Sequence, residues 1–196
     1  MDSKFKLIID SFGKDRFKSD EMLKDYTFLG LGGPAKLFFI AFTTNELIKI
    51  VDMCRRLKLP FFLFGTGSKI MMSDQGFNGL VIKNRTKSIE VISIKGKATR
   101  VGIGVEEALV EIDSGVSITK FAEFLQTQGL IYENFVNIPG SIGGNLFVSK
   151  ILQNMIKSIK VLALNGNILE IGPNELRLNS HIILSAIFRI KAKNLV

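Results

Sequence analysis

Two short glycine-bearing loops carry the residue types in this chain that are best suited to chemistry. Residues 64–69 read Phe-Gly-Thr-Gly-Ser-Lys, and residues 137–145 read Asn-Ile-Pro-Gly-Ser-Ile-Gly-Gly-Asn. Because glycine has no side chain, main-chain N–H groups in such loops can approach an anion closely. Each loop, taken alone, is either a phosphate-binding loop or a plain tight turn.

The first loop follows a predicted buried strand at residues 61–64. That strand belongs to a predicted strand–helix–strand unit, and α/β sheets bind ligands at the carboxyl ends of their strands. The loop lacks the Gly-x4-Gly-Lys-Ser/Thr spacing of a Walker loop, and no Gly-x-Gly-x-x-Gly opens a helix here. Its position favours an anion site without identifying the ligand.

The second loop combines a proline with small residues. Pro139 fixes its own φ, and Gly140 with the pair Gly143 and Gly144 removes side chains that would keep a ligand away. Ser141 is predicted to cap a short helix. Since free amides at a helix N-terminus attract the oxygens of a diphosphate, we expect such amides at this turn.

The composition is that of a folded protein with a basic field. The chain has 196 residues, 46% of them hydrophobic, and a formal net charge of +8. No apolar run reaches the length of a membrane span, so we expect no membrane partner, and the N-terminus lacks a secretory signal. A single cysteine excludes an internal disulfide and fits a reducing compartment, so we expect a cytoplasmic protein.

The basic residues are spread along the chain and are not interleaved with an aromatic ladder. We therefore expect no nucleic-acid partner. The same positive field suits a diphosphate cofactor or a nucleotide sugar.

Residues 1–84 are predicted to form an N-terminal helix and a first α/β lobe. Thr43 followed by Glu46 is a capping box, and Pro60 ends the helix that it opens. The predicted elements are a helix at residues 5–12, a strand at 36–42, the helix after Thr43, and strands at 61–64 and 79–82.

Residues 85–196 are predicted to form a second, α+β lobe. Its elements are strands at 88–94, 100–103 and 108–113, a helix between a Ser117 or Thr119 cap and Gly129, a hairpin at 156–171, and a central strand at 181–190. The hairpin prediction rests on an Asn-Gly turn between apolar runs. We therefore expect an α+β protein of two lobes whose glycine-bearing loops face each other across a crevice.

Four segments, in the same order, resemble motifs of the UDP-N-acetylenolpyruvylglucosamine reductases, flavoenzymes of peptidoglycan synthesis. The segments are residues 26–35 (YTFLGLGGPA), 64–79 (FGTGSKIMMSDQGFNG), 138–144 (IPGSIGG) and 183–190 (ILSAIFRI). The resemblance covers residues 24–190, nearly the whole chain. It implies a two-lobed FAD-binding fold of the vanillyl-alcohol-oxidase type.

Carried over to this sequence, the family's motifs imply two groups of FAD-binding residues. The first loop would contact the pyrophosphate through the main chain of Gly65, Thr66, Gly67, Ser68 and Lys69. The second loop would line the flavin and its phosphates through Ile138, Pro139, Gly140 and Ser141, with Gly143 and Gly144 permitting close approach. Lys69 replaces an Asn of the family, and its ammonium can pair with a phosphate.

The resemblance also implies a catalytic part that we expect this chain to lack. The family passes hydride from NADPH through the flavin to an enolpyruvyl nucleotide sugar, and a Ser or Cys with a Glu partner in a third domain supplies the proton. That domain follows the last matched strand, and only six residues follow Ile190 here. We therefore assign no catalytic residue in this chain.

Two further segments depart from the family pattern. Residues 145–154 read NLFVSKILQN where the family has Asn-Ala-Gly-Ala-Tyr-Gly, and residues 176–180 read LRLNS where it has Tyr-Arg-x-Ser. Arg177 is then a relic of the Arg that works beside the family's substrate. We expect it not to be catalytic.

Several other polar groups are predicted to be structural. Cys54 lies on the apolar face of a predicted helix, and His181, the only histidine, opens an apolar strand. The acidic run at Glu106 and Glu107 is typical of the solvated face of a hairpin. Without a cluster of ligands at suitable spacing, we expect no metal site.

Two functions follow from these observations. The first is a FAD-dependent oxidoreductase with NADPH as electron donor, which has an altered substrate or relies on another protein chain to complete the site. The alternative is a non-catalytic flavin- or nucleotide-binding relative with a regulatory or interaction role. The core pattern continues through Ile190, which argues against an incomplete fold.

Overall fold

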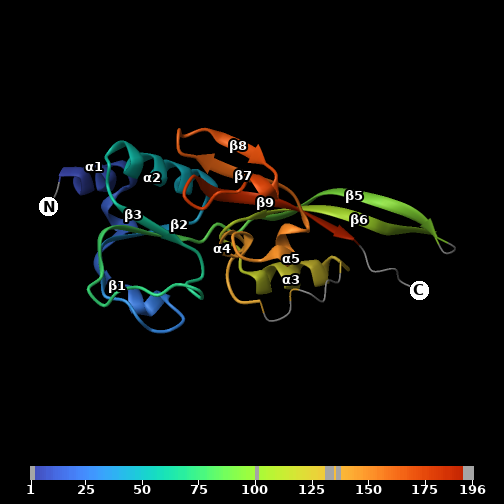
Figure 1. Cartoon of the computed structure of the whole chain (residues 1–196), viewed down its shortest axis with the longest axis horizontal. Coiled ribbons are helices and arrows are strands. Elements are labelled where there is room, and N and C mark those ends of the chain that lie inside the picture. The colour runs from blue at the N-terminus through green and yellow to red at the C-terminus, as the bar shows by residue number, and fades with distance from the viewer. Residues whose placement is uncertain (1–2, 100–101, 131–134, 136–137, 192–196) are drawn as a thin grey trace. The chain divides into compact units, whose positions relative to one another are not determined.

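Two separate sheets, one in each half of the chain, organise the fold (Figure 1). The structure is a computed structural model, and it describes residues 3–99, 102–130, 135 and 138–191. The first unit is Met1–Thr86 and the second is Lys87–Val196. Each unit combines helices with a sheet, which confirms the predicted α+β class.

The first unit has a four-stranded sheet in the order β1-β2-β4-β3. Its main elements are α1 (Ser3–Phe12), β1 (Phe17–Met22), β2 (Pro34–Ala41), α2 (Thr44–Arg56), β3 (Phe61–Phe64) and β4 (Phe77–Asn84). Strand β1 is antiparallel to β2, whereas β2, β4 and β3 run parallel. The predicted strand–helix–strand unit is therefore β2-α2-β3, with β4 inserted between its strands.

Alternating apolar residues on β2 give the first unit a core on each face of its sheet. Phe39 is buried on the helical side, where the ring of Phe12 from α1 lies 5.1 Å from its ring. Phe38 is buried on the other side, in a cluster with Phe64 and Val81. Because side chains alternate along a strand, one apolar segment serves both cores.

The N-terminus of α2 confirms the predicted cap. The Thr43 hydroxyl accepts a hydrogen bond from the Glu46 N–H at 3.1 Å, and the Glu46 carboxylate accepts one from the Phe42 N–H at 2.8 Å. Glu46 also pairs with Arg16 at 2.6 Å, and the hydrogen bond from Arg16 lowers the pKa of Glu46. One carboxylate thus joins the helix start to the turn before β1.

Strand β1 lies between the helix predicted at residues 5–12 and the strand predicted at 36–42, where no element was predicted. Its residues FKSDEM are mostly exposed, and Lys18 pairs with Glu21 at 2.6 Å. Charged side chains are typical of edge strands, where they discourage pairing with other chains. Because this segment is polar, its sequence did not indicate the strand, which pairs with β2 from Phe17 to Met22.

The second unit has a five-stranded antiparallel sheet in the order β5-β6-β9-β7-β8. Its elements are β5 (Ile89–Thr99), β6 (Gly102–Asp113), α3 (Ile118–Thr127), α4 (Ile142–Leu146), α5 (Lys150–Gln153), β7 (Ile156–Ala163), β8 (Ile168–Ile171) and β9 (His181–Lys191). Strand β9 is central, as its apolar run predicted. The Asn-Gly turn between β7 and β8 is confirmed, with Gly166 at φ 86°.

One element prediction in the second unit is wrong. The strand predicted at residues 108–113 and residues 102–103 of the one predicted at 100–103 belong to a single strand, β6, without a turn at Gly104; residues 100–101 lie outside the described residues. Strand β5 pairs with β6 with register shifts between Val91 and Ser93 and between Lys95 and Gly96. Since β9 pairs with β6 only from Glu107, β5 and β6 continue past it as a two-stranded arm (Figure 1).

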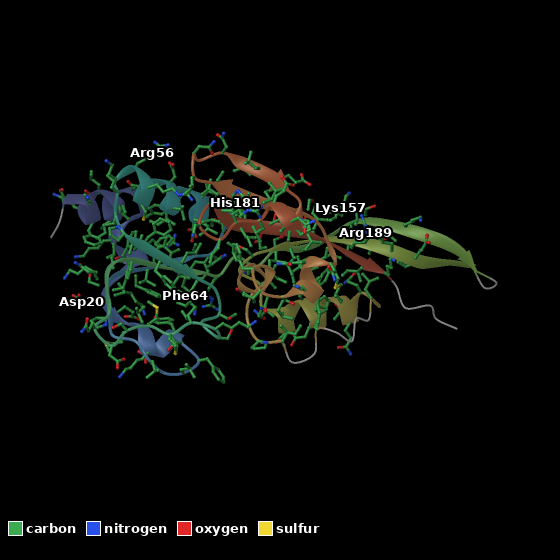
Figure 2. The ribbon with its side chains drawn as sticks, in the orientation of Figure 1. Asp20, Arg56, Phe64, Lys157, His181 and Arg189 are labelled. Carbon is green, nitrogen blue, oxygen red and sulfur yellow. The ribbon has the colours of Figure 1, made fainter. Side chains whose placement is uncertain are left out.

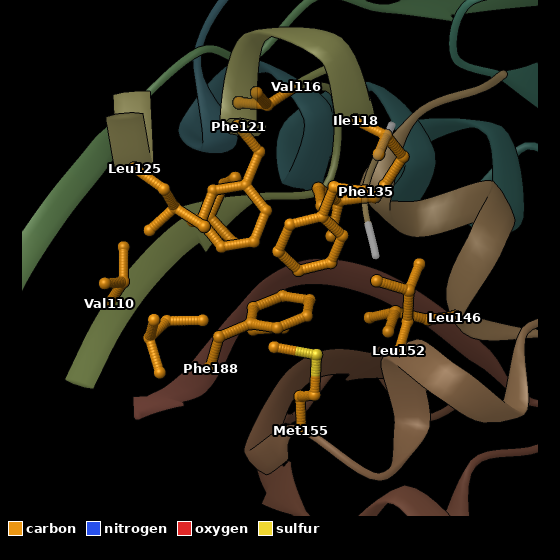
Figure 3. Close-up of a cluster of buried hydrophobic side chains, with 14 of the residues drawn as sticks. Val110, Val116, Ile118, Phe121, Leu125, Phe135, Leu146, Leu152, Met155 and Phe188 are labelled. Carbon is orange, nitrogen blue, oxygen red and sulfur yellow. The ribbon is translucent and has the colours of Figure 1, made fainter. Parts of the chain in front are cut away.

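Aromatic and aliphatic residues from α3, α4, α5 and the sheet form the core of the second unit (Figure 3). The ring of Phe121 lies 5.1 Å from that of Phe135 and 5.0 Å from that of Phe188. Helix α3 begins at its Ser117 cap, whose hydroxyl accepts from the Lys120 N–H, and Gly129 follows its end at φ 70°. This core supports the second loop.

We predict that Leu125→Ala, in the centre of this core, lowers the free energy of unfolding by about 2 to 5 kcal/mol. Leu125 is fully buried, so truncation leaves a cavity. The matched control is Leu164→Ala, because Leu164 is 63% exposed; it should change stability by less than about 0.5 kcal/mol. Urea denaturation measures both, and equal losses would contradict this description of the core.

Candidate functional site

The first loop connects β3 to β4 at the carboxyl end of β3. Phe64, labelled in Figure 2, is the last residue of β3, and Gly65 follows it directly. Phe64 and Lys83 are neighbours in the parallel register of β3 and β4. The loop therefore lies at the edge of a parallel sheet where strands end, as predicted.

Four consecutive main-chain amides of this loop have no protein acceptor. Within the part of the chain that the structure describes, the N–H groups of Gly65, Thr66, Gly67 and Ser68 donate no hydrogen bond. Gly67 is nonetheless buried. Because buried main-chain donors nearly always have partners, the unpartnered amide of buried Gly67 fits a bound anion, and its neighbours extend the row of available donors. The hydroxyls of Thr66 and Ser68 lie 3.0 Å apart and hydrogen-bond to each other, and Lys69 is exposed.

The back of the loop is held against residues 26–28. The Gly67 carbonyl accepts a hydrogen bond from the Phe28 N–H at 3.1 Å. Gly67 has φ +77°, and a Cβ on it would lie 2.0 Å from the Tyr26 carbonyl oxygen. No other residue fits this contact, so the glycine is required by close packing and by its left-handed backbone.

The same close packing continues along the two segments. The Gly33 N–H donates to the Ser73 carbonyl at 2.9 Å, and a Cβ on Gly33 would lie 2.1 Å from the Asp74 carbonyl oxygen. A Cβ on Gly76 would lie 2.1 Å from the Pro34 carbonyl oxygen. Residues 26–35 and 64–79, two of the four segments in the resemblance, thus form one continuous main-chain layer.

The second loop begins helix α4. Asn137 lies outside the described residues, and the description starts at Ile138. The Ser141 hydroxyl accepts from the Gly144 N–H at 3.4 Å, which confirms the predicted cap. Ser141 also forms an isolated antiparallel bridge with Ser117, the cap of α3. The loop is therefore anchored to the start of another helix.

The expectation of free amides at the start of α4 is wrong. The Ile142 N–H donates to the Val116 carbonyl at 2.8 Å, and the Gly143 N–H donates to the Ser114 carbonyl at 2.9 Å. The Gly144 N–H is taken by Ser141, as described above. Gly143 packs internally as well, since a Cβ on it would lie 3.0 Å from the Ser114 Cβ. These N–H groups are already hydrogen-bonded to acceptors within the protein, which could not be predicted from the sequence.

Two amides of the second loop differ from the others. Among the described residues, the N–H groups of Gly140 and Ser141 have no protein acceptor. The Gly140 carbonyl, by contrast, accepts from the Ile118 N–H at 2.9 Å. Gly140 has φ +117°, and Pro139 has no N–H to donate. Any donors for a ligand in this loop are therefore the two amides before α4, not those within it.

Asn145 is an organising residue that sequence reasoning missed. Its side chain is fully buried, and its amide nitrogen donates to the Pro139 carbonyl at 3.1 Å and the Ser141 carbonyl at 3.0 Å. These bonds hold the turn that carries Gly140 and Ser141. The signal was present in the sequence, as a polar residue directly after two glycines and before an apolar pair.

The two loops belong to different units. Gly65 to Lys69 lie in the first unit, and Ile138 to Gly144 lie in the second. The structure brings the predicted residues together within each loop. A crevice shared by the two loops stays a prediction.

The other side chains that could take part in catalysis are either buried or hydrogen-bonded within the protein. Cys54 is fully buried, and burial raises the pKa of its thiol to about 12, which confirms a core role. His181, at the start of β9 (Figure 2), accepts the Arg177 N–H through Nδ1 at 3.2 Å. Arg177 donates to the carbonyls of Asn174 at 2.8 Å and Leu176 at 3.0 Å.

In the described ranges, no group of three or more His, Cys, Asp or Glu side chains is arranged to hold a metal ion. Over the same ranges, none of the helices has the length and apolarity needed to cross a membrane.

Comparison with known proteins gives matches over most of the chain. Residues 35–172 match the profile of the family described as FAD binding domain. The UDP-N-acetylenolpyruvoylglucosamine reductase of Desulfosudis oleivorans is 31% identical over 147 residues, 74% of this chain and 44% of that protein. The reductase of Clostridium tetani is 27% identical over 202 residues, 93% of this chain and 60% of that protein. The chain spans about half the length of these relatives.

Solved structures share the fold at low sequence identity. The 4-ethylphenol oxidase from Gulosibacter chungangensis, in an isoeugenol complex, has a TM-score of 0.65 and 14% identity, and the match covers 100% of this chain and 44% of that one. p-Cresol methylhydroxylase with substrate bound has a TM-score of 0.61 and 14% identity, covering 100% and 45%. Together with the match to the FAD binding domain family, these structures confirm the predicted fold of the vanillyl-alcohol-oxidase type.

We predict that Gly67→Ala destabilises the chain by about 1 to 3 kcal/mol, because the methyl group meets the Tyr26 carbonyl and the backbone is left-handed. Gly144→Ala is the matched control, since its Cβ would meet only the Ser141 Oγ at 3.6 Å, an ordinary contact. Thermal unfolding of the two variants measures the difference. If both unfold at the same temperature, the main-chain layer does not hold the loop.

We predict that Asn145→Ala lowers the free energy of unfolding by about 1 to 3 kcal/mol, because two carbonyl groups lose their donor inside the protein. Asn154→Ala is the control; Asn154 is exposed and follows α5. Urea denaturation with both variants gives the comparison. An Asn145→Ala chain as stable as the control would show that the buried amide does not hold the turn.

Proposed function

Because the chain belongs to the FAD-binding domain family, we propose that it binds FAD with the pyrophosphate against the loop at residues 65–69. The observation that supports this most strongly is the row of main-chain amides at Gly65, Thr66, Gly67 and Ser68, which have no acceptor in the described protein. A pyrophosphate offers several anionic oxygens to such a row. Lys69, which is exposed at the end of the loop, would add a positive charge.

The second loop would contribute differently. Ile138 and Pro139 would lie along the flavin, and Gly140 and Ser141 would offer their two main-chain N–H groups. Gly143 and Gly144 would shape the turn without donating, because their amides are already bonded within the protein. This division assigns anion binding mainly to the first loop.

The proposed activity is a reductase reaction of the kind named for the relatives. Bound FAD supplies hydride transfer, and the protein supplies binding, orientation and the proton. The name of the similar reductases supports an enolpyruvyl nucleotide sugar as the acceptor. We propose NADPH as the electron donor. Since we assign no proton donor to the described residues, we propose that a further polypeptide segment or a partner chain supplies it. We propose a cytoplasmic site for this chemistry.

A second candidate is a non-catalytic flavin-binding relative. Its specific support is the local use of Arg177, whose guanidinium donates to two carbonyls of its own turn. The segment after the second loop forms α4 and α5, and its Asn145 is committed to buried hydrogen bonds. Both groups serve the fold rather than a substrate.

We predict that the purified chain shows visible flavin absorption, or gains it on addition of FAD until one FAD is bound per chain. FAD at about 100 times its Kd should then stabilise the fold by about 2.7 kcal/mol, which raises the Tm. Adenosine serves as a control ligand because it lacks the pyrophosphate and the flavin. A colourless protein whose Tm does not respond to FAD would refute FAD binding.

Turnover separates the two candidates. NADPH oxidation that depends on an enolpyruvyl derivative of UDP-N-acetylglucosamine would support the reductase. A chain that binds FAD and oxidises no NADPH with this substrate would support the non-catalytic relative.

A further inference from the structure

Lys83 is a partly buried lysine without a counter-charge. It lies on β4, opposite Phe64 in the register of β3 and β4. With respect to the described residues, its ammonium takes part in no ion pair and no hydrogen bond. Removing a charge from water costs free energy unless another group compensates. The fold therefore keeps this cation beside β3 at a cost.

Two aromatic rings hold the Lys83 ammonium. Its Nζ lies 5.1 Å from the centroid of the Tyr26 ring and 5.0 Å from that of the Phe64 ring. Cation–π contacts fix the position of an ammonium but leave its charge uncancelled. Burial, and after it the positive charge of Arg85, lower the pKa of Lys83. An anion beside the ammonium would relieve both effects.

Both residues that hold Lys83 also border the first loop. Phe64 directly precedes Gly65, and the Tyr26 carbonyl lies against Gly67 at the back of the loop. The unpaired ammonium is therefore fixed between the two residues that adjoin the row of free amides. Tyr26 and Phe64 thus connect a positive charge with a row of four N–H donors in the first unit.

We propose that Lys83 is a phosphate-binding residue, whose ammonium pairs with a phosphate group of the dinucleotide that the amides of Gly65 to Ser68 bind. This inference rests on the proposed FAD binding. Lys83 lies outside the four segments that resemble the reductases, so the resemblance does not assign it. The two rings act as positioning groups that hold the ammonium in place before the ligand arrives.

The test compares Lys83→Met with Lys49→Met in titrations of the full chain with FAD and with riboflavin, which lacks phosphate. Lys49 is a matched control because it also lies over an aromatic ring, with Nζ 4.6 Å from the Phe12 centroid, but on α2. Lys83→Met should raise the Kd for FAD about tenfold or more, because a charge-assisted contact is lost. Its Kd for riboflavin should stay within about twofold of wild type, as should both Kd values of Lys49→Met.

The Tm of the ligand-free variants separates binding from folding. Lys83→Met should unfold at the wild-type temperature or above it, because an uncompensated charge is replaced by an apolar chain of similar length. If Lys83 only braces Tyr26 and Phe64, its replacement lowers the Tm and leaves the FAD Kd unchanged, which would overturn the proposal. Equal weakening of FAD and riboflavin would overturn it as well.

Failure of the proposed function gives a different result. A wild-type chain that binds no FAD would overturn both proposals together. A wild-type chain that binds FAD with the same Kd as Lys83→Met would overturn only the role of Lys83.

Discussion

The close approach of main chain to main chain at three glycines is the constraint on which the candidate site depends. At Gly67, Gly33 and Gly76 a single methyl group would collide with a carbonyl oxygen of the facing segment. This packing presses residues 26–35 against the loop that follows β3. The Gly67 carbonyl accepts a hydrogen bond from the Phe28 N–H, whereas the N–H groups of residues 65–68 have no acceptor among the described residues. Packing of the two segments therefore requires glycine at these three positions.

The two glycine-bearing loops look alike in sequence but differ in their hydrogen bonds. The loop after β3 leaves four successive amides without acceptors in the described protein, whereas the start of α4 gives its amides to Ser114, Val116 and Ser141. The first loop is thus suited to binding an anion, and the second is mainly a folded junction between helices. The proposed role of Lys83 would add to this difference, because its ammonium lies over the ring of Phe64, the residue directly before the first loop.

Local signals in the sequence predicted much of the fold. The Thr43 and Ser117 caps, the Asn-Gly turn of the β7–β8 hairpin and the apolar run of β9 each reflect chemistry within a few residues. What could not be predicted depends on distant partners. Strand β1 exists because β2 pairs with a charged segment, and the amides of α4 are bonded by carbonyls from before α3. The sequence singled out both loops, but which of their amides lack protein acceptors among the described residues depended on hydrogen bonds to distant residues.

The most direct test of this account is amide hydrogen exchange, followed by NMR with and without FAD. Without FAD, the amides of Gly65, Thr66 and Ser68 should exchange rapidly, while those of Ile142 and Gly143 should be protected by their protein acceptors. FAD should then slow exchange at Gly65 to Ser68 and leave Ile142 and Gly143 as they were. FAD-induced protection confined to Ile142 and Gly143, or none at residues 65–68, would contradict the account.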